Sequence, residues 1–404
     1  MSTRPPAIVL GGDSNALSIA RSLGRLGVEV FGIGVAPFVG RSRHLKLIEV
    51  ADSRDPEADW AACLLGRATD HLQGAVVLAG SDVGLVVLAR HRQELAERFA
   101  LDISDVDSQL TMLDKLRTYE VARDAGVPTP MFWRIDTPSD LERHRTALVY
   151  PLIVKPLLSH HFQSAFPGLS KFRVVSGEDE LLEAYGELTA AGLAVMLVEK
   201  IQMPDDHLCS YYTYLDESYT ALFDFTKRVI RRNPPGMGVG TYHITDWNPE
   251  VRDAAMRLFK AVGLQGLANA EFIRDDRDGR LKLIECNARF TAANPLVTAA
   301  GLDLAKFVYL RIIGSPVELP RQYTVGLRLL YPSDDVRAFL ALRTRGKLGP
   351  VGWLRSLAHR QTFAYARWDD PGPAVSRALL RSSRGLRKAI GTVRARTRTE
   401  AGSN

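Results

Sequence analysis

Two acidic residues stand in a pattern that suits metal binding. Glu271 lies in the alternating run 268–274, Glu285 lies in a second alternating run, 281–287, and an Asp-Arg-Asp-Gly turn joins the runs. Alternation is typical of strands, and the turn predicts a hairpin with the two carboxylates side by side. Facing carboxylates repel unless a cation lies between them, and Asn287 adds a third oxygen on the same strand face. The pattern favours a magnesium site, with an exposed polar strand face as the alternative.

Two lysines occupy positions from which an ammonium could meet phosphate. Lys155 ends the apolar run Tyr-Pro-Leu-Ile-Val-Lys, where an inward-pointing ammonium needs an anionic partner. Lys115 lies near the start of a helix expected over Met112–Ala125, which Gly126 ends. Taken singly, each lysine is more simply interpreted as a surface residue.

A loop after another apolar strand offers contacts for a nucleotide base and a ribose. The strand is expected over 194–199, and the loop after it contains Asp206 and His207. Extended backbone can present amide and carbonyl groups to an adenine edge, and an acid can reach ribose hydroxyls. The residues at this junction are Glu199, Lys200 and Ile201.

A basic cluster precedes a glycine-rich stretch that ends at Gly240. Two facing strands are expected before it, around Tyr211–Leu215 and Tyr219–Phe225. A basic cluster followed by a flexible loop suits a γ-phosphate or an anionic substrate, and a solvated charged loop is the alternative. No G-x-x-x-x-G-K-S/T sequence occurs, which disfavours a P-loop enzyme. The cluster consists of Lys227, Arg228, Arg231 and Arg232.

The segment before these motifs has its own pattern. Apolar runs at 7–11 and 28–33 flank a helical spacing, and the pattern repeats at 74–78 with a helix expected over Val83–Arg98. This βαβ signal predicts a small, mainly parallel α/β domain over residues 1–105. The turn after the first run lacks the third glycine of a dinucleotide-binding fingerprint, so a tight strand-to-helix turn is favoured.

In their order along the chain, these segments resemble the ATP-grasp superfamily, which includes biotin carboxylase, carbamoyl-phosphate synthetase, D-alanine–D-alanine ligase and D-aspartate ligase. The resemblance covers about Leu110 to Gly314. It implies an α/β (α+β ATP-grasp) fold in which the parallel domain precedes an ATP-grasp domain over 106–320. The implied parts are a smaller subdomain with a lid (106–200), a metal-binding subdomain (201–320), a C-terminal extension (321–373) and a basic tail (374–404).

The resemblance also implies roles for individual residues, with ATP and Mg²⁺, or Mn²⁺ in its place, as cofactors. The lid differs from that of many relatives, because 157–171 contains one glycine, bulky aromatics and the pair His160-His161, although Lys171 could still reach phosphate. Arg289 matches a basic residue that faces the acyl phosphate or the substrate carboxylate, and Arg228 and Arg231 are assigned to catalysis with it. Metal ligands are Glu271, Glu285 and Asn287. Nucleotide contacts are Lys115, Lys155, Lys171, Glu199, Lys200, Ile201, Asp206 and His207.

The reaction implied is an ADP-forming ligation of two small molecules. A carboxylate is activated as an acyl phosphate and an amine then attacks it. Activation of bicarbonate, as in biotin carboxylase, is one alternative, and a non-catalytic ATP-binding adaptor is another. Retention of the three metal-ligand positions disfavours the adaptor.

Charge and composition limit the partners. The 404 residues are 46% hydrophobic and 24% charged, as in soluble globular proteins, with a net charge of +6. From Ser376 onward there are eight basic residues and one acid, so that segment contributes +7 and the remainder is near −1. A nucleic-acid partner is therefore not expected.

Location and assembly follow from the same composition. The three cysteines have no metal spacing, and no signal region or membrane-spanning run occurs, so a cytoplasmic protein is expected. The expected protein partner is a second copy of the chain, with which it would form a homodimer. The tail predicts either a disordered segment or an amphipathic helix that lies peripherally on the inner membrane surface, with apolar residues Val375, Leu379, Leu386, Ile390 and Val393.

Overall fold

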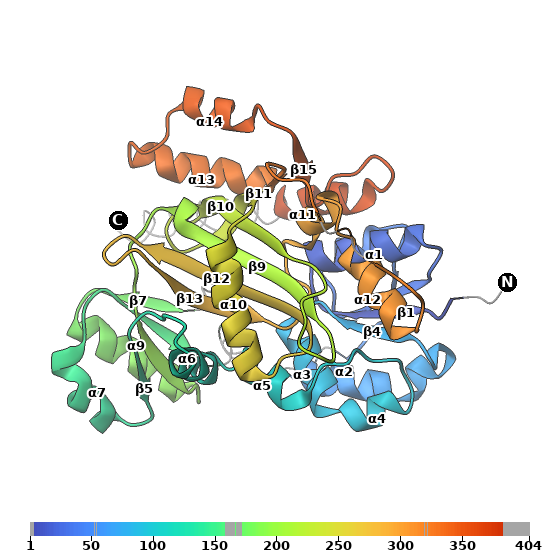
Figure 1. Ribbon diagram of the computed structural model, residues 1–404, viewed down its shortest axis with the longest axis horizontal. Coiled ribbons are helices and arrows are strands. Elements are labelled where there is room, and N and C mark those ends of the chain that lie inside the picture. Colours follow the sequence, from blue (N-terminus) through green and yellow to red (C-terminus); the bar gives the residue numbers. More distant parts are fainter. Residues whose placement is uncertain are drawn as a thin grey trace, which may run out of the picture.

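The computed structural model describes residues 4–51, 53, 55–157, 166, 172–318, 320 and 322–382. Over these residues the strands form three sheets, of four, seven and four strands. Figure 1 shows the seven-stranded sheet in the centre, with the N-terminal sheet on one side and the smaller four-stranded sheet on the other. The expected metal residues Glu271, Glu285 and Asn287 lie on the central sheet, and the expected nucleotide residues Lys155 and Glu199 lie on the smaller sheet.

The N-terminal sheet is parallel, in the order β3-β2-β1-β4. Its longer strands are buried throughout, as expected where helices cover both faces. The predicted parallel α/β arrangement is confirmed, but the helix expected over Val83–Arg98 is two helices that meet at His91. The elements are β1 (Ala7–Leu10), α1 (Ser14–Arg25), β2 (Val30–Ile33), β3 (Lys46–Leu47), α2 (Pro56–Leu65), β4 (Val76–Ala79), α3 (Asp82–Arg90) and α4 (Arg92–Ala96).

Two helices, α5 (Val106–Leu113) and α6 (Lys115–Asp124), connect this domain to the smaller sheet. The single helix expected over Met112–Ala125 was wrong. Asp114 adopts an extended conformation and accepts hydrogen bonds from the backbone amides of Leu116 and Arg117. An aspartate that caps the second helix in this way ends the first one, and it makes Lys115 the first residue of α6.

The smaller sheet has an apolar cluster of its own, with α7 (Pro138–His144) and α9 (Glu178–Ala190) packed against it. Its strands are antiparallel in the order β5-β8-β6-β7. The cluster includes Leu152, Val154, Leu188 and Leu197. The strands are β5 (Phe132–Ile135), β6 (Leu152–Pro156), β7 (Arg173–Val175) and β8 (Val195–Glu199).

The central sheet has the order β13-β12-β9-β10-β11-β14-β15, and α10 (Pro249–Val262) crosses one of its faces (Figure 1). The predicted hairpin is β12–β13. The strand expected around Tyr219–Phe225 was wrong, because β10 begins at Phe225 and carries the basic cluster within it. The strands are β9 (Leu208–Leu215), β10 (Phe225–Asn233), β11 (Val239–Asp246), β12 (Gly266–Asp275), β13 (Arg280–Asn287), β14 (Arg328–Leu330) and β15 (Gln361–Phe363).

The C-terminal part returns to the N-terminal domain. Asp370 accepts hydrogen bonds from Arg21 Nε at 2.9 Å and from Ser42 Oγ at 2.7 Å, and all three groups are buried. A helical segment, 372–382, follows it. Within the described residues, no helix combines the length and the apolarity that crossing a membrane requires. The helices of this part are α11 (Asn294–Ala299), α12 (Leu304–Ile312), α13 (Pro332–Thr344) and α14 (Pro350–Leu357).

Candidate active site

One row of polar residues crosses four strands of the central sheet. Glu271 of β12 lies directly opposite Glu285 of β13, as the hairpin predicted. On its other side Glu271 is paired with Ser210 of β9, which is paired with Lys227 of β10. Directly paired residues share a face of a sheet, so the two carboxylates, the hydroxyl and the ammonium all lie on the face opposite α10.

The next row on the same face contains Asn287, which is paired with Asn269 of β12. Asn287 Nδ2 donates a hydrogen bond to Asn269 Oδ1 at 3.1 Å. Because the amide N–H is used in this contact, the oxygen of Asn287 is the atom suited to a cation. Both carboxylates and this amide thus come from adjacent positions of one hairpin.

Burial makes the charges of this face interdependent. Lys227 is 2% exposed, and its Nζ donates to Ser210 Oγ at 3.1 Å. Burial lowers the pKa of Lys227, while the nearby Glu271 opposes that shift. Burial raises the pKa of Glu271, with Glu285 adding to the rise and Lys227 opposing it. Two carboxylates and an amide oxygen that share one buried ammonium fit a hard divalent cation, which would stabilise both carboxylates in their charged form.

A cavity of about 190 Å³ lies between the smaller sheet and this face. Its floor at one end is an apolar cluster that includes Ile201, Leu208 and Ile273. Its other end is charged, with Glu271 and Glu285 among the lining residues. An apolar end and a charged end within one cleft suit a nucleotide, whose base is flat and apolar and whose phosphates are anionic. Predicted nucleotide residues that line the cleft are Lys115, Lys155, Glu199, Lys200 and Ile201.

A β-bulge aims one carbonyl at the lysines of the smaller sheet. The β12–β13 register shifts between Glu271 and Phe272, so that Ile284 has no direct partner on β12. The carbonyl of Ile284 accepts hydrogen bonds from Lys155 Nζ at 3.3 Å and from Tyr119 Oη at 3.0 Å. The bulge therefore fixes Lys155 beside Glu285, at the charged end of the cleft.

The end of β8 and the two residues after it, 199–201, form a junction that we name the hinge, and the carboxylate of Glu199 there is engaged by the protein. Glu199 Oε1 lies 2.6 Å from Arg277 Nη2, and Glu199 Oε2 accepts a hydrogen bond from the Met131 amide at 3.2 Å. The side chain is 8% exposed. This residue therefore presents mainly its backbone to the cleft, in keeping with a hinge that binds adenine through main-chain groups.

The ribose candidates do not line this cleft. Asp206 is exposed and lines an adjoining groove, and His207 Nδ1 lies 3.2 Å from the Arg274 carbonyl. Asp205 is the engaged acid of this loop, because it accepts from Arg232 Nε at 2.9 Å and from the Gly236 amide at 2.8 Å. Asp205 thereby holds the β10–β11 loop against the hinge. No local pattern distinguishes Asp205 from its neighbour Asp206.

The structure does not bring the two arginines assigned to catalysis to the cleft. Arg231 is buried and its guanidinium forms two 2.8 Å contacts with the Asp335 carboxylate of α13. Arg228 follows Lys227 directly and so points to the opposite face of the sheet, where its Nε lies 3.6 Å from Asp246. The basic cluster lies on a strand, which alternates faces, so Lys227 shares the carboxylates' face. Arg232, which lies beyond the irregular register of β10, lines the cleft with them.

The Arg231–Asp335 ion pair is expected to contribute to the free energy of unfolding. Asp335→Ala leaves the buried guanidinium without its counter-charge, and we expect a loss of roughly 3–5 kcal/mol of unfolding free energy. Denaturant titration with a fluorescence readout measures it, and Asp253→Ala on the exposed side of α10 is the control. A change below about 1 kcal/mol, the range of an exposed pair, would contradict this structural role.

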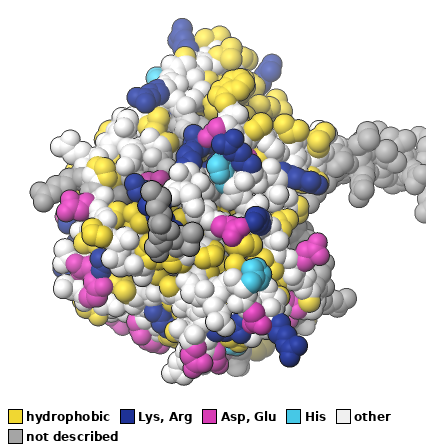
Figure 2. All heavy atoms as spheres, turned by 90° about the vertical axis from the view of Figure 1, so that its right-hand side faces the viewer, with side chains coloured by type: hydrophobic (Ala, Val, Ile, Leu, Met, Phe, Trp, Pro, Cys, Tyr) yellow, Lys and Arg dark blue, Asp and Glu magenta, His cyan; other side chains and the backbone are white. Residues whose placement is uncertain are grey.

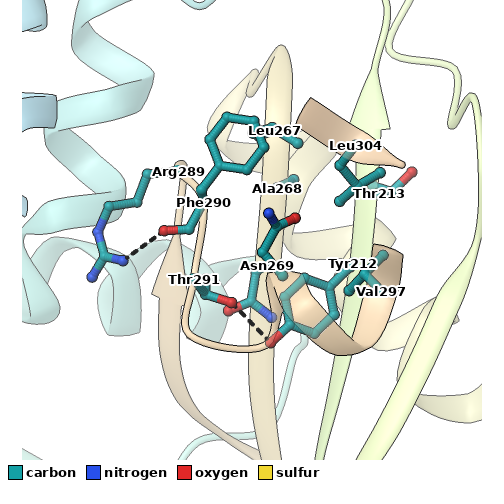
Figure 3. Close-up of a pocket in the computed structure, with 11 residues that line it drawn as sticks. Tyr212, Thr213, Leu267, Ala268, Asn269, Arg289, Phe290, Thr291, Val297 and Leu304 are labelled. Atoms are coloured by element: carbon teal, nitrogen blue, oxygen red, sulfur yellow. Dashed lines mark hydrogen bonds between the residues drawn. The ribbon is translucent and has the colours of Figure 1, made fainter. Parts of the chain in front are cut away.

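Arg289 lies where the N-terminal domain meets the loop after β13. Its guanidinium pairs with Asp82 at the start of α3, at 2.6 Å, and its Nη1 donates to the Phe290 carbonyl at 3.1 Å. Figure 3 shows Arg289 pointing away from Asn269 and toward the N-terminal helices. The cavity drawn there holds about 10 Å³, the size of one water molecule, so it is too small for a substrate. Lys171, His160 and His161 lie outside the described residues.

Comparison with known proteins agrees with this geometry. Residues 244–319 match the family described as "Carbamoyl-phosphate synthase L chain, ATP binding domain". The chain is 24% identical to D-aspartate ligase of Enterococcus faecium over 74% of this chain and 75% of that protein. It is 26% identical to D-alanine–D-alanine ligase of Methylococcus capsulatus over 64% of this chain and 83% of that protein.

A solved structure shows the same fold. Biotin carboxylase from Campylobacter jejuni, in complex with β-γ-ATP, superposes with a TM-score of 0.62 at 16% identity, over 81% of this chain and 75% of that chain. The matched family, the ligase relatives and the two-sheet cleft with its paired glutamates all point the same way. The chain is therefore similar to the ATP-grasp carboxylate–amine ligases, and the activity that these comparisons support is that of an ATP-binding, ADP-forming ligase that activates a carboxylate as an acyl phosphate for attack by an amine.

Proposed function

We propose that ATP binds in the cleft between the smaller and the central sheet, with the adenine on the apolar cluster and the phosphates at the charged end. The observation that carries this assignment is the row Lys227, Ser210, Glu271 and Glu285, of which the two glutamates line that end of the cleft. Lys115 and Lys155 contact phosphate, and Lys227 offsets charge near the γ-phosphate. Glu271, Glu285 and Asn287 would hold magnesium, with manganese as a substitute. The ion would supply positive charge that offsets the charge on the transferred phosphoryl group.

The residues act by positioning and by neutralising charge. A carboxylate oxygen attacks the γ-phosphorus, the bond between that phosphorus and the β–γ bridging oxygen breaks, and ADP leaves. The amine nitrogen then attacks the acyl carbon, orthophosphate leaves with the bonding electron pair, and the nitrogen loses a proton to solvent. No protein nucleophile is required. Arg289 orients the carboxylate at the reacting end.

A second cavity, of about 250 Å³, is the proposed entrance for the carboxylate or the amine. It lies between the first turn of the N-terminal domain, the β10–β11 hairpin and the C-terminal segment. Acidic and basic groups both line it, which suits a substrate that carries both charges. Together with the names of the ligase relatives, this lining supports amino acids or their derivatives as substrates. The charged and aromatic lining residues are Asp13, Tyr331, Asp334, Tyr365, Arg377 and Arg381.

We also propose a division of the chain into four parts. Their bounds are 1–105, 106–320, 321–373 and 374–404. A homodimer and a peripheral membrane contact of the tail also belong to the proposal, and residues 383–404 of that tail lie outside the described residues. Bicarbonate as the activated acid is the second candidate, favoured by the fold of the biotin carboxylase neighbour.

A product assay tests the proposal. We expect incubation with ATP, magnesium and a panel of amino acids, peptides and bicarbonate to release ADP and orthophosphate with the acid that is activated. Hydroxylamine in place of the amine should give a hydroxamate from an amino acid or peptide, and stimulation by bicarbonate alone would favour the second candidate. AMP and pyrophosphate as products would refute acyl phosphate chemistry. If no acid on the panel leads to release of either pair of products, the non-catalytic adaptor is favoured.

A further inference from the structure

The C-terminal extension contains a long segment without acidic residues. From Val336 to Trp368 the chain has seven Lys or Arg and no Asp or Glu. All seven are exposed, and six of them form no ion pair with any acidic residue that the structure describes, whereas Arg367 pairs with Asp369. The six are Arg337, Arg343, Arg345, Lys347, Arg355 and Arg360. This charge is separate from that of the tail.

Apolar side chains are exposed among these cations. Of 18 exposed large hydrophobic residues in the described part of the chain, ten fall between 325 and 380. On α13, Val336 and Leu340 are one turn apart and are 41% and 50% exposed, and on α14, Val351 and Leu354 are 62% and 60% exposed. None of the residues of α14 is buried. Figure 2 shows hydrophobic and basic side chains together at the upper end of the molecule, where these helices lie in Figure 1.

The two helices form one fixed unit. The rings of Phe339 and Trp353 stack with centroids 4.6 Å apart, and Trp353 Nε1 donates to Asp335 at 2.9 Å. Asp335 in turn is paired with Arg231 of the central sheet. The exposed sides of α13 and α14, which we name the α13–α14 surface (residues 332–360), are therefore held in place by contacts within the fold.

We infer that the α13–α14 surface docks on an anionic lipid bilayer. Its cations match the lipid headgroups and its aliphatic side chains reach the region just below them, which is how amphipathic surface helices bind. The basic tail is not expected to bind this surface, because both carry positive charge and like charges repel. An isologous contact between two copies of the surface would bring the same positive charges together and is disfavoured for the same reason. Nucleic acid would match the cations and leave the exposed aliphatic groups without a partner. The inference does not depend on the proposed reaction.

Vesicle sedimentation with the full chain tests it. Wild-type protein should bind vesicles that contain phosphatidylglycerol at least about tenfold more tightly than vesicles of phosphatidylcholine alone. The double variant Val351→Asp/Leu354→Asp and the double variant Arg343→Glu/Arg355→Glu should each lose most of that binding. Matched controls are Leu182→Asp on α9 and Arg257→Glu/Lys260→Glu on α10, which alter equally exposed residues away from the surface and should bind as wild type does.

The outcomes separate this surface from the tail and from other partners. Thermal melting of each variant shows that the fold is intact, because all the altered side chains are exposed. Binding that survives both double variants would assign the membrane contact to the tail and overturn the inference. Binding that does not distinguish the two lipids, or binding to nucleic acid without binding to vesicles, would overturn it as well.

Discussion

Glu285→Gln is expected to abolish ligation while the protein stays folded and still binds ATP. The substitution removes one of the two carboxylates that face each other across β12 and β13, and it keeps the size of the side chain. Loss of several kcal/mol of charge stabilisation at the phosphoryl group corresponds to a fall in kcat of roughly a thousandfold or more. Phosphate release at saturating ATP measures it, and Glu271→Gln should behave in the same way.

The control for this experiment is Glu94→Gln, at an exposed position of α4. ATP affinity should change far less than kcat, because the adenine end of the cleft is untouched. Titration with magnesium should show a weakened metal dependence in Glu285→Gln and a normal one in the control. Full turnover of Glu285→Gln at saturating ATP would show that the β12–β13 hairpin does not bind the metal.

Arg289→Ala is expected to suppress hydroxamate formation by roughly a hundredfold to a thousandfold, the loss seen when one preorganised donor is removed from a reacting centre. The guanidinium is held by Asp82 and by the Phe290 carbonyl, so its position is set before a substrate arrives. ATP binding, measured with a fluorescent analogue, should survive, since Arg289 does not line the nucleotide cleft.

Two further variants sharpen this test. Asp82→Asn keeps the side-chain shape and removes the charge that orients Arg289, so it should raise the KM for the acid more than it lowers ATP affinity. Arg274→Ala, a half-buried arginine near the end of β12 that pairs with Glu250, is the control for loss of an arginine. Unchanged hydroxamate formation in Arg289→Ala would show that another residue orients the carboxylate.

Strand periodicity explains which parts of the site could be predicted. Alternation in β12 and β13 fixes the face of each residue, and the short turn fixes the register, so the pairing of Glu271 with Glu285 follows from local sequence. The same rule separates Lys227 from Arg228 once a strand is assumed. The prolines and glycines after the cluster favour a loop, so the sequence alone does not indicate that the strand extends through it.

Other features depend on residues far apart in the chain. Arg231 meets Asp335 and Arg289 meets Asp82, across 104 and 207 positions. The sequence around Asp335 or Asp82 contains no pattern that indicates its partner, because an ion pair requires only that the two residues lie close together in the folded state. The β-bulge at Ile284 also has no signal in the sequence, and it decides where Lys155 points. These contacts are properties of the tertiary structure.

The anchor between Arg21 and the segment 365–370 has a consequence for synthesis. Arg21 is 4% exposed, and its hydrogen bonds go to the Tyr365 carbonyl and to the carboxylate and carbonyl of Asp370. While the chain emerges from the ribosome, the N-terminal domain therefore carries a guanidinium whose partners have not yet been made. Its final packing must wait until residues 365–370 have been translated. A nascent chain that stalls before Tyr365 would present an incomplete N-terminal domain to chaperones and proteases.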